Sequence, residues 1–271
     1  MLHLDRAISL VRRARERELI FGMHCSSPCP QAVEVIGMGG ADYVIIGMEI
    51  EQLDLSRLED LVRTADGVGI PSMVKIRRND PKLASDAFNA GAQFVMAPHI
   101  TSASQLEAMI TASRFAPEGA RGLCPVARYV AYGMMPTAKA IEATHAYPMI
   151  IPIIEDREAI DNIDEILRIE ETSIIEIGPW DLSLSLGCKN PDLSYGNRET
   201  WEAIELVAAR AKERGKVLLG PVWMPKEMSS TEIIAFQREK LGPLGFNVLY
   251  DGDLFSMGRY LGRLGRARAA S

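Results

Sequence analysis

Short apolar runs alternate along the chain with longer segments of helical periodicity. Eight runs are rich in aliphatic residues and apolar on both faces, which is typical of parallel strands covered by helices. They are Leu19–His24, Tyr43–Gly47, Met73–Ile76, Phe94–Pro98, Met149–Glu155, Ser173–Gly178, Val217–Val222 and Asn247–Tyr250. The helical segments between them include Pro30–Met38, Ser56–Ala65, Pro81–Ala90, Ser102–Ser113, Asp156–Ile169, Arg198–Arg214 and Ser229–Leu241.

Glycines stand where several of these helices end and the next strand begins, at Gly39-Gly40, Gly91 and Gly215, as expected of C-terminal caps. Eight strand–helix units in about 250 residues are typical of a (β/α)₈ barrel. We therefore expect an α/β fold, a TIM barrel that occupies residues 1–271 as one domain with an amphipathic N-terminal helix. The alternative, a doubly wound sheet, would need a glycine-rich phosphate loop after an early strand, and no G-x-G-x-x-G motif occurs there.

One irregular region, from Pro117 to about Met135, is too long for an ordinary connection. It contains Arg121 and Arg128, which have the charge to bind an anionic substrate tail or a neighbouring subunit. Its place between strands four and five leads us to expect that it reaches either the active-site face or a partner.

Composition excludes some classes of function. A net charge of -6 and a pI near 5.4 argue against a nucleic-acid surface, which needs a basic face. No apolar run approaches the ~20 residues of a transmembrane helix, and the N-terminus lacks the pattern of a signal peptide. The four cysteines form no metal motif and are expected to be reduced thiols. We expect a cytoplasmic protein without a membrane or nucleic-acid partner.

Polar side chains follow most of the predicted strands. In a barrel, the C-terminal ends of all strands meet at one mouth, where active sites lie. The residues at these positions are His24, Glu49, Lys75, His99, Glu155, Asp181, Asp251 and Asp253.

Glu155 and Asp181 are the most informative pair. Two carboxylates on adjacent strand ends suit a hard cation such as Mg²⁺ or Mn²⁺, with positions left open for a chelating substrate oxygen. Such an ion acts as a Lewis acid and stabilises an enolate. Alternatively, each carboxylate caps the helix that follows it, and the pattern alone leaves both interpretations open.

The segment IIEDREA at 153–159, followed by IGPWDLS at 177–183, resembles the metal signature of the class II pyruvate aldolases, the HpcH/HpaI family. That family belongs to the phosphoenolpyruvate-binding barrels, with macrophomate synthase and the citrate lyase β-subunit as relatives. Shorter pieces resemble it in the same order, and the resemblance runs from about Gly22 to Asp253. These pieces are Gly40–Tyr43, Asn79–Pro81, Ala90–Gln93, Ala97-Pro98 and Gly119–Gly122.

The resemblance implies roles for individual residues. Glu155 and Asp181 match the metal ligands, and Glu49 matches a carboxylate that contacts metal-bound water. The resemblance also implies a homo-oligomer, commonly a hexamer. The residues expected near the substrate are Gly91, Gln93, Pro98, Arg121, Gly178, Pro179 and Trp180.

Three features, at four positions, depart from the family pattern. Gly47 and Ile50 stand where the family has the aspartate and histidine that handle the proton. Lys75 replaces an arginine that holds the pyruvyl oxygens, and the two are not equivalent at a bidentate site. Trp180 replaces a small residue beside the second metal ligand.

Two histidines are candidates for the missing base. His24 and His99 both follow strands at the mouth, and an ordinary histidine has a pKa near ~6.5, suited to proton transfer. Each is alternatively a structural histidine. Lys75 is either a point charge for the substrate, a Schiff-base lysine or a solvated side chain.

The sequence therefore predicts a divalent-metal-dependent carbon–carbon lyase that acts on a 2-oxo acid through a pyruvate enolate. Because the usual base is absent, a decarboxylase of an oxaloacetate-type diacid, or a biosynthetic enzyme that uses the enolate, stays open. A ligand-binding pseudoenzyme and a Schiff-base lyase are further alternatives.

Overall fold

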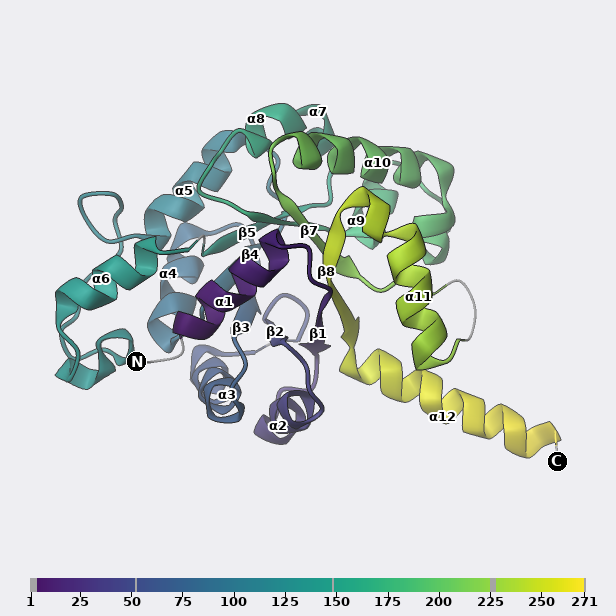
Figure 1. Ribbon diagram of the computed structural model, residues 1–271, viewed down its shortest axis with the longest axis horizontal. Coiled ribbons are helices and arrows are strands. Elements are labelled where there is room, and N and C mark those ends of the chain that lie inside the picture. Colours follow the sequence, from purple (N-terminus) through teal and green to yellow (C-terminus); the bar gives the residue numbers. More distant parts are fainter. Residues whose placement is uncertain (1–3, 52, 148, 225–227, 271) are drawn as a thin grey trace.

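The computed structural model describes residues 4–51, 53–147, 149–224 and 228–270, which form a closed barrel of parallel strands (Figure 1). Strands pair in sequence order, and β1 closes the barrel against β8. They are β1 Ile20–Cys25, β2 Tyr43–Gly47, β3 Ser72–Lys75, β4 Phe94–Ala97, β5 Ile150–Ile154, β6 Ile174–Ile177, β7 Val217–Pro221 and β8 Phe246–Gly252. All eight predicted strands are present, so the TIM barrel is confirmed and the doubly wound sheet is excluded.

Helices surround this barrel on its outer face (Figure 1). They are α1 Leu4–Arg15, α2 Pro30–Met38, α3 Leu55–Val68, α4 Pro81–Ala90, α5 Ala103–Ser113, α6 Thr137–His145, α7 Arg157–Asp161, α8 Ile163–Leu167, α9 Pro179–Ser185, α10 Arg198–Glu213, α11 Ser230–Lys240 and α12 Asp253–Ala270, with short 3₁₀ turns η1 Arg128–Gly133, η2 Pro191–Gly196 and η3 Gly242–Leu244.

Local chemistry sets several helix boundaries. Asp54 begins α3 by accepting a hydrogen bond from the Arg57 amide, and Ser229 forms a capping box with Glu232 at the start of α11. Gly91 ends α4 with a φ of 107°, in the left-handed region that glycine adopts without strain. These caps fix where each helix turns back toward the next strand.

The single helix predicted over Asp156–Ile169 is wrong, because the structure has two short helices there, α7 and α8. They meet at Asn162, whose backbone leaves the helical region with φ -100° and ψ 11°. The Asn162 side chain donates a hydrogen bond of 2.9 Å to the carbonyl of Thr101. Asparagine side chains compete with helical hydrogen bonds in this way, which explains the break.

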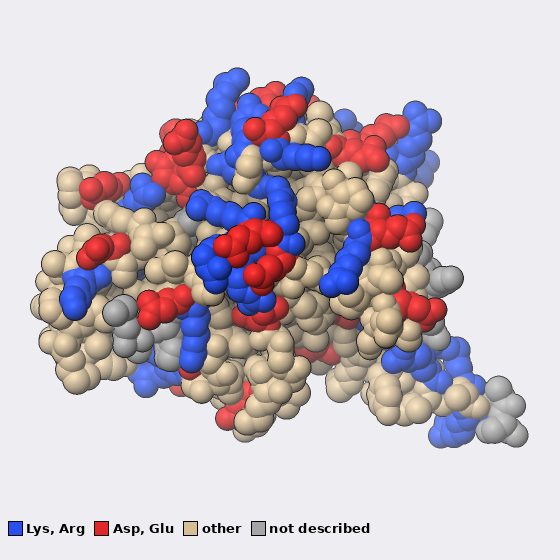
Figure 2. Space-filling model, viewed as in Figure 1, with Lys and Arg blue, Asp and Glu red and all other residues tan. Residues whose placement is uncertain are grey.

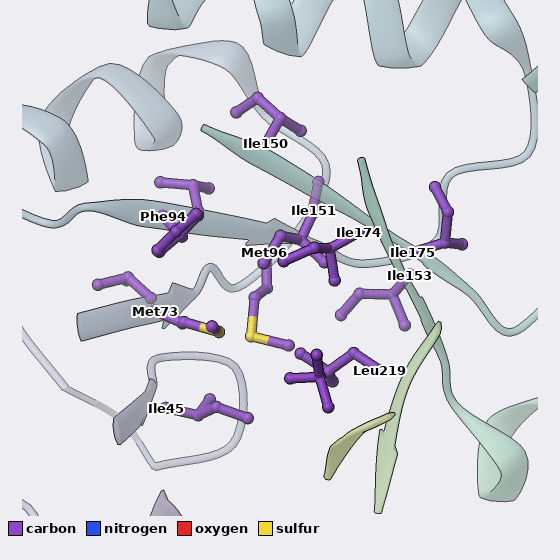
Figure 3. Close-up of a cluster of buried hydrophobic side chains, with 14 of the residues drawn as sticks. Ile45, Met73, Phe94, Met96, Ile150, Ile151, Ile153, Ile174, Ile175 and Leu219 are labelled. Carbon is purple, nitrogen blue, oxygen red and sulfur yellow. The ribbon is translucent and has the colours of Figure 1, made fainter. Parts of the chain in front are cut away.

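Apolar side chains fill the interior of the barrel. Met73, Met96 and Ile153 point toward one another from three strands (Figure 3). Successive side chains of a strand alternate between the interior and the helices, so residues two positions further along the same strand also point inward. Lys75 and Glu155 are the inward residues at the C-terminal ends of β3 and β5, which brings both to the mouth.

The opposite, N-terminal end of the barrel is covered by α1 and by the segment that precedes β5. Asn247, at the start of β8, donates hydrogen bonds to the Ala14 and Glu18 carbonyls at the end of α1. Arg128 of the long irregular segment forms an ion pair with Asp66, near the end of α3. Of the two alternatives for this segment, contact with the active-site face is not supported, because Arg128 is held at the N-terminal end of the barrel. Contact with a neighbouring subunit stays a prediction.

The surface carries charges of both signs. Lysine and arginine side chains are interspersed with aspartate and glutamate over the face shown in Figure 2. In the described part of the chain, no helix is long and apolar enough to cross a membrane.

The C-terminal helix α12 extends away from the barrel rather than packing along it (Figure 1). The hydrophobic pattern of the sequence does not predict this helix. Large apolar side chains on it are about half exposed, namely Leu254, Phe255, Met257, Tyr260, Leu261 and Leu264.

Candidate active site

An ion pair between Lys75 and Glu49 lies at the mouth. Lys75 ends β3 and Glu49 follows β2, and the Lys75 Nζ atom is 2.7 Å from Glu49 Oε2. Both side chains are largely removed from solvent, with 18% and 20% of their surface exposed. Glu49, which was expected to contact metal-bound water, instead has Lys75 as its partner in this structure.

Glu176 is a charged residue of the interior that is not among the predicted site residues. It lies in β6 and is only 2% exposed. The Tyr250 hydroxyl donates a hydrogen bond of 2.8 Å to Glu176 Oε1. Its Oε2 atom is buried without a hydrogen-bond partner among the residues that the structure describes. A single carboxylate within the apolar run Ile174–Ile177 was the available signal, since glutamate is almost never fully buried unless it is paired.

Three carboxylates keep Lys75 charged. Burial by itself would lower the pKa of Lys75, but the charges of Glu176 and Glu155 and the hydrogen bond to Glu49 outweigh it and raise that pKa. The ammonium group is therefore the stable form at neutral pH, and it places a positive charge at the mouth.

Glu155 is a buried carboxylate beside the start of α9. It is 1% exposed, and its Oε1 atom accepts a hydrogen bond of 2.9 Å from the amide of His99. Burial raises the pKa of Glu155 to about 7, although the charge of Lys75 opposes that shift. A Cβ atom at Gly178 would lie 2.6 Å from Glu155 Oε2, so glycine is needed for this approach.

Asp181 is the second carboxylate of the predicted metal pair and lies in the first turn of α9. It is exposed and has no hydrogen bond or ion pair with any residue in the described ranges. Neither Glu155 nor Asp181 caps a helix: Asp156 begins α7 and Gly178 begins α9, both without a side-chain cap. The capping interpretation is therefore not supported.

Two carboxylates are the kind of ligand that a hard divalent cation prefers. Magnesium is usually held by one or two carboxylates, with water and substrate oxygens filling its other positions. Within the described residues, no group of three or more His, Cys, Asp or Glu side chains is arranged to hold a metal. The site therefore suits an ion that is exposed to substrate rather than one enclosed by protein.

His24 lies at the mouth beside a second carboxylate. Its Nε2 atom is 3.2 Å from Glu51 Oε1, and both side chains are mostly buried. The carboxylate of Glu51 lies over Gly47, where a side-chain Cβ would collide with it. Burial would raise the pKa of Glu51, but the imidazole of His24 beside the carboxylate outweighs burial and lowers that pKa. Glu51 was not predicted as a site residue.

His99 is held differently. Its Nδ1 atom lies 2.9 Å from Asp156 Oδ2 and 3.7 Å from Glu155 Oε1, and half of its side chain is exposed. Its φ of 53° is unusual for a residue other than glycine and directs its amide to Glu155. Burial would lower the pKa of His99, but the hydrogen bond to Asp156 and the nearby carboxylates raise it.

Three predicted substrate-binding residues, Gly91, Gln93 and Arg121, do not lie at the mouth. Gln93 precedes β4, and its side chain accepts a hydrogen bond from the Ser72 amide and donates one to Asp66, all at the N-terminal end. A four-residue strand is about 13 Å long, which separates Gln93 from the end of β4 where Pro98 lies. The prediction that Gly91 and Gln93 lie near the substrate is therefore wrong in its placement.

Arg121 occupies an aromatic cage near Gln93. Its guanidinium carbon lies 5.4, 4.8 and 4.6 Å from the ring centres of Phe88, Phe115 and Tyr129. Burial lowers the pKa of Arg121 to about 10. These contacts hold the arginine at the N-terminal end, which corrects its assignment to the substrate site.

The other predicted substrate residues follow strands at the mouth. Pro98 follows β4 and is buried, and Pro179 is buried in the first turn of α9. Trp180 is 43% exposed and lines a groove of about 1300 Å³ together with Tyr195 and Trp223. The tryptophan therefore connects the start of α9 to a large apolar groove beside the mouth.

Comparison with known proteins places this architecture among aldolases and lyases. Residues 21–247 match the family model described as HpcH/HpaI aldolase/citrate lyase. A hydroxypyruvate/pyruvate aldolase of Rhizorhabdus wittichii is 31% identical over 175 residues, covering 65% of this chain and 68% of that protein. A pyruvate aldolase of Rhizobium etli is 26% identical over 205 residues, covering 76% and 79%.

Solved structures show the same fold. An HpcH/HpaI aldolase/citrate lyase family protein from Burkholderia cenocepacia J2315 superposes with a TM-score of 0.81 at 23% identity, over 97% of this chain and 99% of that one. A citrate lyase β-subunit from M. tuberculosis, complexed with oxaloacetate and magnesium, gives a TM-score of 0.57 at 18% identity, over 88% and 92%.

Proposed function

The chain belongs to the HpcH/HpaI aldolase/citrate lyase family and is an aldolase-type lyase, and from this we propose its reaction. It cleaves or forms a carbon–carbon bond of a 2-oxo acid through a pyruvate enolate, with a divalent cation. The observation that carries this proposal is the pair of carboxylates at the mouth. Glu155 is buried against Gly178 at the start of α9, and Asp181 lies unpartnered among the described residues in the first turn of the same helix.

Glu155 and Asp181 would hold Mg²⁺ or Mn²⁺, and the magnesium in the citrate lyase β-subunit complex is consistent with this choice. When bound there, the cation supplies a Lewis acid that stabilises negative charge on the 2-oxo oxygen. Lys75 adds a fixed positive charge for the substrate carboxylate or enolate, and Glu49 orients its ammonium group at 2.7 Å. Pro98, Pro179 and Trp180, which follow strands at the mouth, would supply an apolar wall beside these charges.

A second candidate is the decarboxylation of an oxaloacetate-type diacid, or a biosynthetic reaction of the resulting enolate. Gly47 and Ile50 favour it, because neither residue can move a proton and the Ile50 side chain is 82% exposed. Loss of carbon dioxide leaves its bonding electron pair on the substrate as the enolate, so no carbon-bound proton has to be removed. Both reactions would use the same cation and the same Lys75.

The test measures metal binding and chemistry separately. Mn²⁺ affinity is measured by electron paramagnetic resonance, and loss of the pyruvate methyl signal in D₂O by proton NMR, with and without EDTA. We expect Glu155→Gln and Asp181→Asn each to weaken Mn²⁺ binding at least tenfold and to reduce the exchange rate about a hundredfold, since each removes a charged ligand. Asp161→Asn, an exposed carboxylate of α7, is the matched control.

Three outcomes would contradict the proposal. Unchanged Mn²⁺ affinity in both variants would remove the metal site. Tight binding of Mn²⁺ and oxalate without turnover of pyruvate or oxaloacetate would indicate a ligand-binding pseudoenzyme. Trapping of pyruvate on Lys75 by borohydride in the presence of EDTA would indicate a Schiff-base lyase, which the raised pKa of Lys75 disfavours because that route needs a neutral amine.

We further propose that residues 1–271 act as one barrel domain within a homo-oligomer, a hexamer by family resemblance. The exposed apolar side chains of α12 support self-association, since such patches usually mark interfaces. A cytoplasmic location agrees with Cys25, Cys29, Cys124 and Cys188, which are all free thiols.

A further inference from the structure

The mouth contains a histidine–carboxylate pair assembled from the ends of β1 and β2. His24 Nε2 lies 3.2 Å from Glu51 Oε1, with 22% and 12% of the two side chains exposed. The other oxygen of Glu51 accepts a hydrogen bond of 3.1 Å from the Ile50 amide. The carboxylate thus has one oxygen anchored to the backbone and one that faces the imidazole.

Gly47 makes this arrangement possible. It is the last residue of β2, and any Cβ there would occupy the space of the Glu51 carboxyl group. The chain bends at residues 49–51, directly after β2, and the Glu51 carboxylate folds back over the strand end at Gly47. The departure at Gly47 removes a side chain from the mouth and lets a carboxylate four residues later take its place.

The imidazole of His24 lies close to Glu51 without a well-aligned hydrogen bond to it. Its Nε2 atom is buried and makes no well-aligned hydrogen bond to any residue in the described segments. Catalytic hydrogen bonds are often long or poorly aligned without substrate and tighten when it binds. Its Nδ1 atom has no hydrogen-bond partner within the described ranges, and the charged or titratable groups that face the ring are Glu51, Glu176 and Tyr250.

We propose that His24 is the catalytic residue that moves the substrate proton and that Glu51 is its positioning residue. In the exchange reaction, the C3–H bond of pyruvate breaks and its electron pair forms the C2–C3 double bond, while the π pair of the C2 carbonyl moves onto its oxygen to give the enolate. The proton passes to His24 Nδ1, and a deuteron from solvent returns to C3 as the carbonyl re-forms. Glu51 holds the ring through Nε2 and balances the imidazolium charge. This inference rests on the proposed function, since it concerns the enolate of a 2-oxo acid.

His99 is the competing candidate, and the geometry disfavours it. Its Nδ1 atom is already bonded to Asp156, half of the side chain is exposed, and its amide is committed to Glu155. The left-handed backbone at His99 explains its placement as support for the Glu155 carboxylate. His24 and Glu51 make no such contact with Glu155.

The experiment compares two reactions at one site. Exchange of the pyruvate C3 protons in D₂O with Mg²⁺ requires a base, whereas decarboxylation of oxaloacetate does not require removal of a carbon-bound proton. We expect His24→Gln to slow exchange at least a hundredfold while decarboxylation changes less than threefold. Glu51→Gln is expected to slow exchange about tenfold, with Glu51→Asp partly restoring it, because only a carboxylate can hold the imidazole through Nε2.

Two further variants complete the design. Gly47→Ala displaces Glu51 without altering either reacting group, so we expect it to reproduce the effect of Glu51→Gln. His145→Gln makes the same replacement at the N-terminal end of the barrel and should leave exchange within twofold of the unaltered protein. Circular dichroism and Mn²⁺ affinity show that each variant is folded with its metal site intact.

The outcomes separate this inference from the function on which it rests. Exchange in His24→Gln within twofold of the unaltered protein, or a larger loss in His99→Gln, would overturn the His24–Glu51 pair and leave the proposed function standing. Equal loss of exchange and decarboxylation in His24→Gln would also overturn it, because the residue would then act on binding or folding. No exchange by the unaltered protein would overturn the pyruvate enolate itself and the pair with it.

Discussion

At the scale of single residues, burial makes the carboxyl group of Glu155 a weaker acid than that of an ordinary glutamate. Its pKa of about 7 lies above the ordinary value of 4.5, so the folded protein favours the protonated form. The stability that this shift contributes is fully present below about pH 4.5 and is lost as the pH rises through about 7. The whole shift corresponds to roughly 3 kcal/mol, and the proposed cation would offset this loss by neutralising the charge.

We therefore predict that Mg²⁺ stabilises the protein more at pH 8 than at pH 6. At the lower pH the ion must displace a proton from Glu155, whereas at the higher pH the carboxylate is already ionised. Thermal unfolding with and without 10 mM Mg²⁺, measured across this range, checks the prediction. In Glu155→Gln, which cannot ionise, the Mg²⁺ effect should be small and independent of pH. An equal Mg²⁺ effect at pH 6 and pH 8 in the unaltered protein would contradict the argument.

At the scale of elements, the junction between β6 and α9 determines whether the two predicted ligands can cooperate. Gly178 is the N-terminal cap of α9, and its lack of a side chain admits the Glu155 carboxylate. We predict that Gly178→Ala weakens Mn²⁺ affinity at least tenfold, because the added methyl group pushes Glu155 from its position. Its φ of -91° is accessible to alanine, so the fold should persist.

Mn²⁺ affinity and urea unfolding are measured together to test the role of Gly178. Gly242→Ala is a suitable control, because a Cβ at that glycine meets no other atom within 4 Å. A Gly178→Ala variant with normal Mn²⁺ affinity would show that Glu155 is not held against α9 in the metal-bound state.

The same scale shows what the sequence can predict. Aliphatic runs of four to seven residues fix the strands, since only a covered parallel sheet buries both faces of so many of them. Residues that follow a strand, such as Lys75 and Glu155, were correctly placed at the mouth. Gln93 was misplaced because it stands before β4, where the chain enters the barrel. The role of Gln93 near the substrate came from the resemblance of residues 91–93 to a family segment, and such a short segment does not show which end of the strand it occupies.

Contacts between distant segments explain what could not be predicted. Glu51 reaches His24 only because Gly47 leaves room for it, and no periodicity in the sequence reveals that turn. Glu176 depends on Tyr250, which is 74 residues away. The composition of each strand determines where it lies, whereas the pairing of buried polar groups depends on barrel closure, which only the structure shows.

At the scale of the whole molecule, α12 extends away from the barrel and leaves large apolar side chains exposed. Leu254, Met257, Leu261 and Leu264 recur at helical spacing on one face of it and are all about half exposed. Burial of a side chain of this size contributes roughly 1.5–3 kcal/mol, so a stripe of four favours association with a second copy. Burial of this stripe in the proposed homo-oligomer would explain why an apolar helix extends away from its own barrel.

We predict that Met257→Glu combined with Leu261→Glu lowers the mass of the assembly, because two carboxylates would have to be buried unpaired in the contact. Light scattering coupled to size-exclusion chromatography measures that mass. Met38→Glu places the same charge on another exposed apolar residue, at the end of α2, and should leave the assembly unchanged. An unaltered mass in the double variant would show that α12 lies outside the interface. If the mass falls while metal affinity is retained, the carboxylate pair at the mouth is complete within one chain.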